Sequence, residues 1–154
     1  MNMKVHYLSQ SNEWSTPQDL FDALDAEFHF TIDVAATPDN AKCKRFYTKE
    51  QDGLSQDWTG ERVWCNPPYG REIGKFIKKL ASGEADIAVA LIPARTDTKY
   101  FHDYIYHKAE IRFIKGRLKF INKSFPSYRE DGNFKISSAP FPSMIAIWRK
   151  GESA

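Results

Sequence analysis

Two segments of the chain place apolar residues at the spacing of one helix face. The first follows Thr16 and Pro17, a hydroxyl N-cap and a first-turn proline that are typical of a helix start. Its apolar positions are Leu20, Phe21 and Leu24. The second stripe consists of Ile73, Phe76, Ile77 and Leu80. We therefore expect one helix that begins at Thr16 and ends near residue 28, and another around residues 73–80.

Short apolar runs between and after these helices predict strands. The runs cover residues 30–34, 63–65, 87–92 and 143–148. Residues 87–92 are continuously apolar and include β-branched side chains, which indicates a central parallel strand. The strand at 63–65 ends at Asn66-Pro67-Pro68, because proline has no N–H group to donate to a neighbouring strand.

The pattern changes after residue 96. Thr96 or Asp97 is expected to cap a helix that continues to about His107, and strands follow at residues 110–114 and 117–121. Lys115-Gly116 separates these two strands, which predicts a hairpin. Alternating strands and helices followed by a hairpin predict an α/β fold. We expect a three-layer sheet, mostly parallel, with an antiparallel C-terminal hairpin edge.

Length and composition indicate one globular domain. The chain has 154 residues (17.8 kDa), of which 42% are hydrophobic and 27% are charged. These values are typical of a protein with its own core and exclude a disordered, collagen-like or disulfide-built chain. We expect residues 1–12 to form a flexible arm and residues 13–150 to form the domain. Residues 122–142 are expected to form a long loop, which in a compact domain is usually functional or mobile.

Cysteine use and hydropathy predict a cytoplasmic protein. Cys43 and Cys65 are too few for a zinc cage and suggest a reducing compartment. No apolar run approaches the roughly 20 residues of a membrane-spanning helix, and residues 1–10 lack the pattern of a signal peptide. His102 and His107 are five residues apart, so they do not share a helix face for a metal ion. We therefore expect no membrane contact and no metal site.

The net charge of +2 conceals an uneven distribution. Residues 1–60 carry a net charge of −5, and residues 61–154 carry +7. Between residues 108 and 129, seven basic residues stand against one acid, Glu110. The basic residues are Lys108, Arg112, Lys115, Arg117, Lys119, Lys123 and Arg129. Such a strip is either a solvated edge hairpin or a surface that faces phosphate groups, and charge alone favours neither.

Asn66-Pro67-Pro68-Tyr69 is the motif with the clearest chemistry. In an open α/β sheet, ligands bind beyond the carboxyl ends of the strands, which is where this turn lies. An amine conjugated to an aromatic ring is a poor nucleophile, and the Asn66 side-chain oxygen and the Pro67 carbonyl can accept its hydrogens and free its lone pair. Tyr69 offers a flat face for a base. The alternative interpretation is a rigid turn with an asparagine cap and a packed tyrosine.

This turn resembles the Asp/Asn-Pro-Pro-Tyr signature of S-adenosylmethionine-dependent amino methyltransferases. More of the chain, about residues 13–149, resembles the small phage-type DNA adenine-N6 methyltransferases. The segments that carry this resemblance, besides the turn, are residues 14–17, 32–36, 52–54, 57–58, 93–96, 116–120 and 141–148. The resemblance implies that residues 13–150 form a minimal Rossmann-like methyltransferase domain with S-adenosylmethionine as its cofactor.

The resemblance also implies which residues hold the methionine end of the cofactor. Thr16 and Pro17 match the segment that contacts this end, and free N–H groups at a helix start suit its carboxylate. Asp33 matches the acid near the ammonium group. Ala35 and Ala36 keep the following loop small, so that the cofactor can approach the backbone, and Asn66 lies beside the same site.

At the adenine end, Asp57 matches the position that binds the cofactor's adenine, and Trp58 is expected to pack beside that ring. The alternatives are a helix cap or turn aspartate for Asp33 and Asp57, and a core position for Trp58. Relatives carry a glycine-rich loop after the first strand, whereas residues 33–38 contain no glycine. This departure argues against a site for a phosphate-bearing nucleotide. Glu50 and Asp52 are both candidates for the acid that binds the cofactor ribose.

The resemblance predicts methyl transfer from S-adenosylmethionine to N6 of a flipped adenine in DNA, because Asn at the first motif position accompanies adenine in this superfamily. Asn66, Pro67 and Tyr69 are the predicted catalytic residues. The residues expected to contact DNA are Arg95, Lys115, Arg117, Lys119 and Lys123, together with the 122–142 loop. Two alternatives stay open: the same chemistry on RNA adenine or a protein glutamine, and an inactive methyltransferase fold that only binds nucleic acid. The resemblance places the reaction in a bacterial or phage-infected cell.

Overall fold

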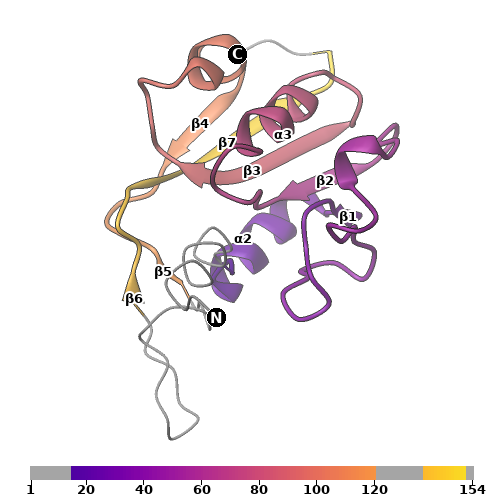
Figure 1. Cartoon of the computed structure of the whole chain (residues 1–154), viewed down its shortest axis with the longest axis horizontal. Helices are drawn as coiled ribbons and strands as arrows, with labels where there is room; N and C mark the ends of the chain where they lie inside the picture. The colour runs from indigo at the N-terminus through magenta and orange to yellow at the C-terminus, as the bar shows by residue number, and fades with distance from the viewer. Residues whose placement is uncertain (1–14, 121–136, 152–154) are drawn as a thin grey trace, which may run out of the picture.

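The computed structural model describes residues 15–120 and 137–151 (Figure 1). The predicted arm at residues 1–12, Lys123, Arg129 and most of the predicted long loop lie outside these ranges. The described residues form a five-stranded sheet with the order β1-β2-β3-β7-β4 and a separate two-stranded sheet of β5 and β6. The chain therefore has the α/β character that its sequence predicts.

Three neighbouring strands of the main sheet run parallel. They are β1 (Ile32–Asp33), β2 (Arg62–Cys65) and β3 (Ile87–Pro93). Asp33 pairs with Trp64, and Trp64 pairs with Val89, so the carboxyl ends of the three strands meet at one edge of the sheet. A parallel bridge between Asp33 and Phe46 adds a further segment along the outer side of β1.

The other half of the sheet is antiparallel and differs from the predicted hairpin. β7 (Ser143–Arg149) lies between β3 and β4 (Glu110–Phe113) and is antiparallel to both. The prediction that residues 110–114 pair with 117–121 is wrong, because β5 (Lys119–Phe120) pairs instead with β6 (Ser137–Ser138). Among the described strands, two pairings of the main sheet are parallel and two are antiparallel, so the sheet is mixed.

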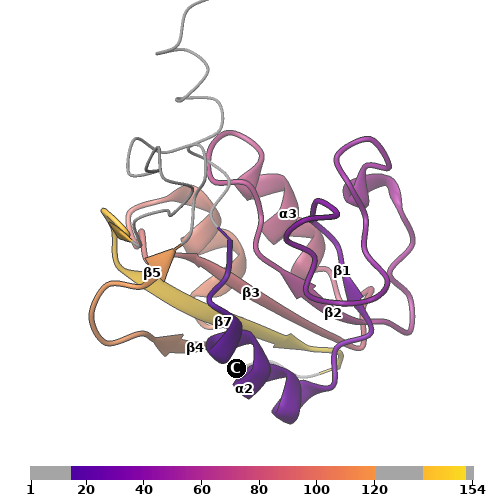
Figure 2. The ribbon, with the colours of Figure 1, turned by 90° about the horizontal axis from the view of Figure 1, so that it is seen from below.

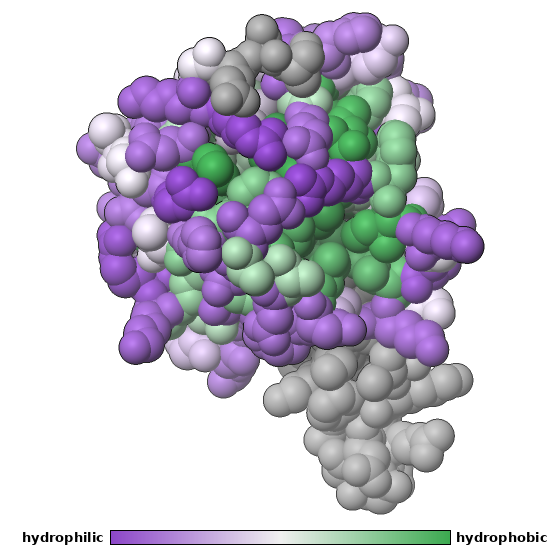
Figure 3. All heavy atoms as spheres, turned by 180° about the vertical axis from the view of Figure 1, so that it is seen from behind, coloured by the Kyte–Doolittle hydropathy of each residue, from purple (hydrophilic) through white to green (hydrophobic). Residues whose placement is uncertain are grey.

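Helices lie on both faces of the main sheet, with α2 (Gln18–Phe28) on one face and α3 (Ile73–Leu80) on the other (Figure 2). The helix α3 buries all four residues of its predicted stripe, whereas α2 buries Phe21 and Leu24 and leaves Leu20 partly exposed. Seen from behind, hydrophobic residues gather towards the middle of the surface among hydrophilic ones (Figure 3). None of the helices in the described ranges is both long and apolar enough to cross a membrane.

Two helix predictions need correction. The residue at the N-cap of α2 is Pro17, and no side chain caps this helix, so Thr16 does not have its predicted capping role. The helix expected from Thr96 or Asp97 to His107 is shorter: it covers residues 99–105, and most of it is a π-helix, η2 (Phe101–Ile105). The Thr98 hydroxyl, rather than Thr96 or Asp97, accepts a hydrogen bond from the Phe101 N–H group at the start of this turn.

Candidate active site

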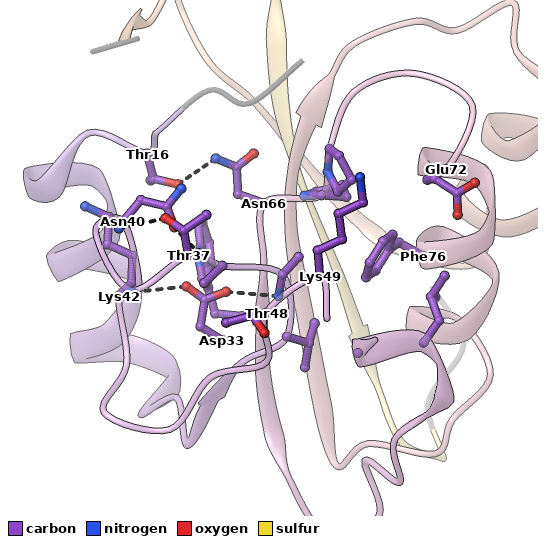
Figure 4. A pocket seen from close by; sticks show the side chains of 18 of the residues that line it. Thr16, Asp33, Thr37, Asn40, Lys42, Thr48, Lys49, Asn66, Glu72 and Phe76 are labelled. Carbon is purple, nitrogen blue, oxygen red and sulfur yellow. Dashed lines mark hydrogen bonds between the residues drawn. The ribbon is translucent and has the colours of Figure 1, made fainter. Parts of the chain in front are cut away.

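A cavity of about 580 Å³ opens at the carboxyl ends of β1 and β2 (Figure 4). It is enclosed by the residues that follow β1, by the segment around η1 (Gly53–Ser55), by the turn after β2 and by one side of α3. The predicted site residues that line it are Thr16, Asp33, Ala35, Ala36, Asp52, Asn66 and Pro67. The fold therefore gathers residues from three distant parts of the sequence around one hollow.

Asp33 is the most buried acidic residue of the cavity, with 2% of its surface exposed. Its Oδ2 atom accepts a hydrogen bond from the Lys42 backbone N–H group at 3.0 Å, and Oδ1 accepts one from the Ala35 N–H group at 3.3 Å. Burial raises the pKa of Asp33 to about 6, although both N–H groups favour the charged form. These bonds fix the carboxylate and the loop that follows β1 relative to each other.

Asn66 begins the turn after β2, and a hydrogen bond ties its side chain to the segment before α2. The Nδ2 atom of Asn66 donates to the Thr16 hydroxyl at 3.0 Å (Figure 4). Pro67, the next residue, is buried and also lines the cavity. The turn thus places Asn66 and Pro67 side by side in the cavity lining.

The wall opposite this turn depends on Gly53, the first residue of η1. A Cβ atom at this position would lie 2.2 Å from the Val34 carbonyl oxygen, so only glycine fits without a shift of the backbone. The close approach brings Asp52 and Leu54 to the cavity lining. Of the two candidates for binding the ribose, Asp52 lies at the cavity, and Glu50 is not part of its lining.

The two ends of the cavity differ in polarity. Around Asp33, its neighbours Asn40 and Lys42 contribute an amide and an ammonium group. Lys42 Nζ also donates to Gln18 Oε1 at 2.8 Å. Towards α3, the apolar lining residues are Leu54, Pro68 and Phe76. The charged side chains of Lys49 and Glu72 also line this side of the cavity (Figure 4). A ligand with a charged end and a flat apolar end would match this arrangement.

Asp57 and Trp58 do not line the cavity. The Asp57 carboxylate accepts hydrogen bonds from the N–H and hydroxyl groups of Thr59, at 2.9 and 2.6 Å, and these bonds lower its pKa. Trp58 is completely buried and donates from Nε1 to the Gly53 carbonyl at 3.0 Å. In this conformation, Asp57 has the bonds of a turn aspartate, and Trp58 supports the wall of the cavity from behind.

Tyr69 and Pro17 also lie outside the cavity lining. Tyr69 is 5% exposed, and its hydroxyl donates to the Leu91 carbonyl at 3.2 Å. The ring meets Phe141 edge to face, with 5.5 Å between the ring centres. Burial also raises the pKa of Tyr69. The ring is therefore packed into the core in this conformation, and its face is not presented to the cavity.

The predicted DNA contacts within the described ranges are exposed. They are Arg95, Lys115, Arg117 and Lys119. Arg112, another base of the predicted strip, has a different environment: its guanidinium makes two hydrogen bonds to the Glu27 carboxylate, at 2.7 and 2.8 Å. This ion pair connects β4 to α2, so Arg112 stabilises the fold. In the part of the chain that the structure describes, no cluster of three or more His, Cys, Asp or Glu side chains could hold a metal ion.

Several lining residues escape sequence reasoning. Lys42, Leu54 and Phe76 come from segments whose place at the cavity is set by the fold. Of these, only Leu54 lies in a segment that carries the family resemblance. The sequence indicates that Phe76 belongs to a core stripe. It does, since it is 7% exposed, and it lines the cavity as well. A helix that follows the motif directly was the one available signal for Phe76.

Comparisons with known proteins identify the family of this chain. The family model described as DNA N-6-adenine-methyltransferase (Dam) matches residues 6–153. The DNA N-6-adenine-methyltransferase of Haemophilus phage HP1 is 29% identical over 130 residues, which cover 81% of this chain and 75% of that protein. The enzyme of the same name from Escherichia phage T1 is 32% identical over 111 residues, which cover 68% of this chain and 45% of that protein. This chain belongs to the DNA N-6-adenine-methyltransferase family.

Proposed function

We propose that the cavity binds S-adenosylmethionine and that the Asn66-Pro67 corner holds the N6 amine of a flipped adenine. Family membership assigns the reaction class, methylation of adenine N6 in DNA, and implies this cofactor. The observation that carries the proposal is the meeting of Asp33 and Asn66 at one cavity. We expect the main sheet to be a variant of the Rossmann-like methyltransferase sheet. We expect the reaction to take place in the cytoplasm of a bacterial or phage-infected cell.

The residues of the cavity fit the cofactor. Its ammonium group would lie near the Asp33 carboxylate, and its carboxylate would meet the polar groups around Thr16 and Pro17. Ala35 leaves space beside the backbone there. The adenine ring would lie in the apolar end, between Leu54 and Phe76. A contact from Asp57 or Trp58 to that ring would require a different conformation of residues 53–59.

The reaction needs an amine that is held and a methyl donor that is already activated. The cofactor, when bound, supplies a methyl group on a positively charged sulfur and leaves as S-adenosylhomocysteine. The Asn66 Oδ1 atom and the Pro67 carbonyl accept hydrogen bonds from the two N6 hydrogens and raise the electron density on the nitrogen. The nitrogen forms its bond to the methyl carbon as the carbon–sulfur bond breaks, and it then releases one of its hydrogens to water as a proton. Flipping the adenine out of a duplex costs a few kcal/mol, which contacts to the phosphate backbone would offset.

Tyr69 retains a proposed role as the stacking surface for the flipped base. Its ring would have to turn away from Phe141 to present a face, because it is packed edge-on in the described conformation. Arg95 lies beside the same group, with its guanidinium 5.9 Å from the centre of the Phe141 ring. Together with Lys115, Arg117, Lys119 and Lys123, Arg95 would face the DNA backbone.

Transfer of a labelled methyl group from S-adenosylmethionine to DNA tests the proposal. Asn66→Ala should reduce the rate at least about a hundredfold, the scale seen when a preorganised polar group is removed from an active site. Cofactor affinity, measured by calorimetry, should change little. Ser82→Ala, outside the cavity lining at the end of α3, is the control and should match the unmodified protein. Full turnover by Asn66→Ala would disprove the catalytic assignment.

Competition between acceptors tests RNA and protein as alternative substrates, and calorimetry tests the inactive alternative. DNA, RNA and a glutamine-containing protein can compete for a limiting amount of labelled cofactor, and DNA should take most of the label. A binding-only protein would show no affinity for S-adenosylmethionine in calorimetry. The cavity with a buried acid and an apolar end favours the enzyme over this alternative.

A further inference from the structure

Thr16 and Asn66 are fifty positions apart in the sequence, and their side chains meet at the cavity edge. We propose that Thr16 is a positioning residue that orients the Asn66 amide, so that Oδ1 rather than Nδ2 faces the substrate amine. The bond of 3.0 Å from Nδ2 to the Thr16 hydroxyl is the contact that sets this orientation. The inference rests on the proposed function, because it assumes that Asn66 accepts a hydrogen from N6.

The chemical need for such a contact follows from the asymmetry of an amide. Rotation of the Asn66 side chain by half a turn exchanges an acceptor for a donor, and a donor cannot bind an N–H group of adenine. An aspartate at this position would present an oxygen in either orientation. The signature allows aspartate or asparagine, and this chain has asparagine. Its activity therefore depends on a partner that distinguishes the two ends of the amide.

The surroundings of Thr16 suit this task. Thr16 is 5% exposed, so little water can reach its hydroxyl and compete for the hydrogen bond to Asn66. A hydroxyl just before a helix usually caps that helix, yet α2 has no side-chain cap. The Thr16 hydroxyl instead bonds to Asn66, which lies directly after β2. A contact between the segment just before α2 and the residue just after β2 thus fixes the orientation of one amide.

Kinetics of Thr16→Val and Thr16→Ser on DNA test the proposal. Valine keeps the shape of threonine but removes the hydroxyl, and it should lower kcat about tenfold, since the productive orientation of the amide loses the hydrogen bond that favours it. Because backbone N–H groups at the start of α2, rather than this hydroxyl, are expected to meet the cofactor carboxylate, the KM for S-adenosylmethionine should stay within about threefold of the original value. Serine keeps the hydroxyl and should restore most of kcat. Thr16→Ala, which also removes the hydroxyl, is a second variant in case valine disturbs folding.

A measurement on the protein alone separates this inference from the proposed function. In a ¹H–¹⁵N spectrum without cofactor or DNA, the side-chain NH₂ signals of Asn66 should shift in Thr16→Val and Thr16→Ala but not in Thr16→Ser. Unmoved signals would disprove the orientation by Thr16, whether or not the protein methylates DNA. Absence of methyl transfer by the unmodified protein, with the expected shifts present, would instead overturn the proposed function and with it the role for N6.

The Asn66→Asp background gives the sharpest kinetic comparison. Because a carboxylate is symmetric, Thr16→Val should cost less than about threefold in this background, against about tenfold with asparagine. An equal loss in both backgrounds would show that Thr16 acts by packing. A loss that appears in the KM for the cofactor rather than in kcat would show that Thr16 only binds the cofactor. Either result overturns the inference, and an inactive Asn66→Asp protein leaves the decision to the spectra and to the serine comparison.

Discussion

A carboxylate as deeply buried as Asp33 changes its charge within the pH range of ordinary experiments. Two backbone N–H groups bind it, but loss of contact with water has the larger effect and raises its pKa to about 6. The pKa of an unburied aspartate lies near 3.8. Folding therefore takes up a proton between pH 3.8 and about 6, and the stability that the protonated carboxyl contributes is lost as the pH rises across this range. The form that binds a cation is thus the less stable one.

This conflict predicts that cofactor affinity depends on pH. Between pH 7.5 and pH 5, the dissociation constant for S-adenosylmethionine should rise about tenfold, because only about a tenth of Asp33 is ionised at the lower pH. Asp33→Asn should bind more weakly at pH 7.5 and lose this dependence. Calorimetry at four pH values measures both effects. Asp86→Asn, an exposed acid before β3, is the control and should keep the original profile.

At the scale of elements, η1 and the end of β1 depend on each other. Gly53 is the point of contact, because any side chain there would meet the Val34 carbonyl. Trp58 strengthens the contact by donating a hydrogen bond to the Gly53 carbonyl from the core. The cavity wall formed by Asp52 and Leu54 is therefore only as stable as this pair of contacts.

Gly53→Ala should lower the free energy of unfolding by about 1–3 kcal/mol, the usual cost of forcing a group into a filled space. It should also weaken cofactor binding, because the wall moves away from β1. Gly74→Ala in α3 is the matched control, since a Cβ atom there meets nothing within 4 Å. Because alanine suits a helix better than glycine, this control should gain about 0.5–1 kcal/mol. Urea unfolding of both variants checks the opposite signs, and equal stabilities would contradict this account of Gly53.

The elements that the sequence predicts well are those whose signal is local. The strands at Ile87–Pro93 and Ser143–Arg149 coincide with long apolar runs, and α3 coincides with a complete helical stripe. The predicted hairpin at Lys115-Gly116 also has a local signal, but distant partners decide which strands pair. β4 pairs with β7, and β5 pairs with β6, so β4 and β5 do not pair with each other. Local patterns do not reveal such long-range competition.

The same distinction applies to the site. The Asn66-Pro67 corner is predictable because the motif and the strand before it adjoin in sequence. Lys42 and Phe76 become neighbours of this corner only through the paths of the 34–54 segment and α3. The orientation of Tyr69 is likewise set by Phe141 and Leu91, which are far away in the chain.

At the scale of the whole molecule, the basic residues divide into those that form ion pairs within the fold and those that are proposed to contact DNA. The first sixty residues are acidic and the remainder is basic. Glu27 and Arg112 connect these two parts through a bidentate ion pair, and Arg149 reaches Glu110 nearby, at 2.8 Å. The bases that stay exposed, such as Arg117 and Lys119, are those that can meet phosphate groups.

Arg117→Ala and Lys119→Ala should each weaken DNA binding and reduce the slope of log K against log salt by about one. Arg112→Ala should leave this slope unchanged and lower stability by no more than about 1 kcal/mol, since its ion pairs are partly exposed. Binding titrations at several salt concentrations, with thermal unfolding of each variant, measure both quantities. An equal change of slope in all three variants would contradict the division between structural and DNA-facing bases.

The place of β7 between β3 and β4 has a consequence for how the protein is made. A ribosome finishes β3 and β4 long before it reaches residue 143, so a growing chain carries two strands whose shared neighbour does not yet exist. Unpaired strand edges of this kind invite association with other chains. Synthesis therefore leaves an interval of exposure that closes only once residues 143–149 have been made, and a chain truncated before residue 143 would be an aggregating fragment rather than a smaller enzyme.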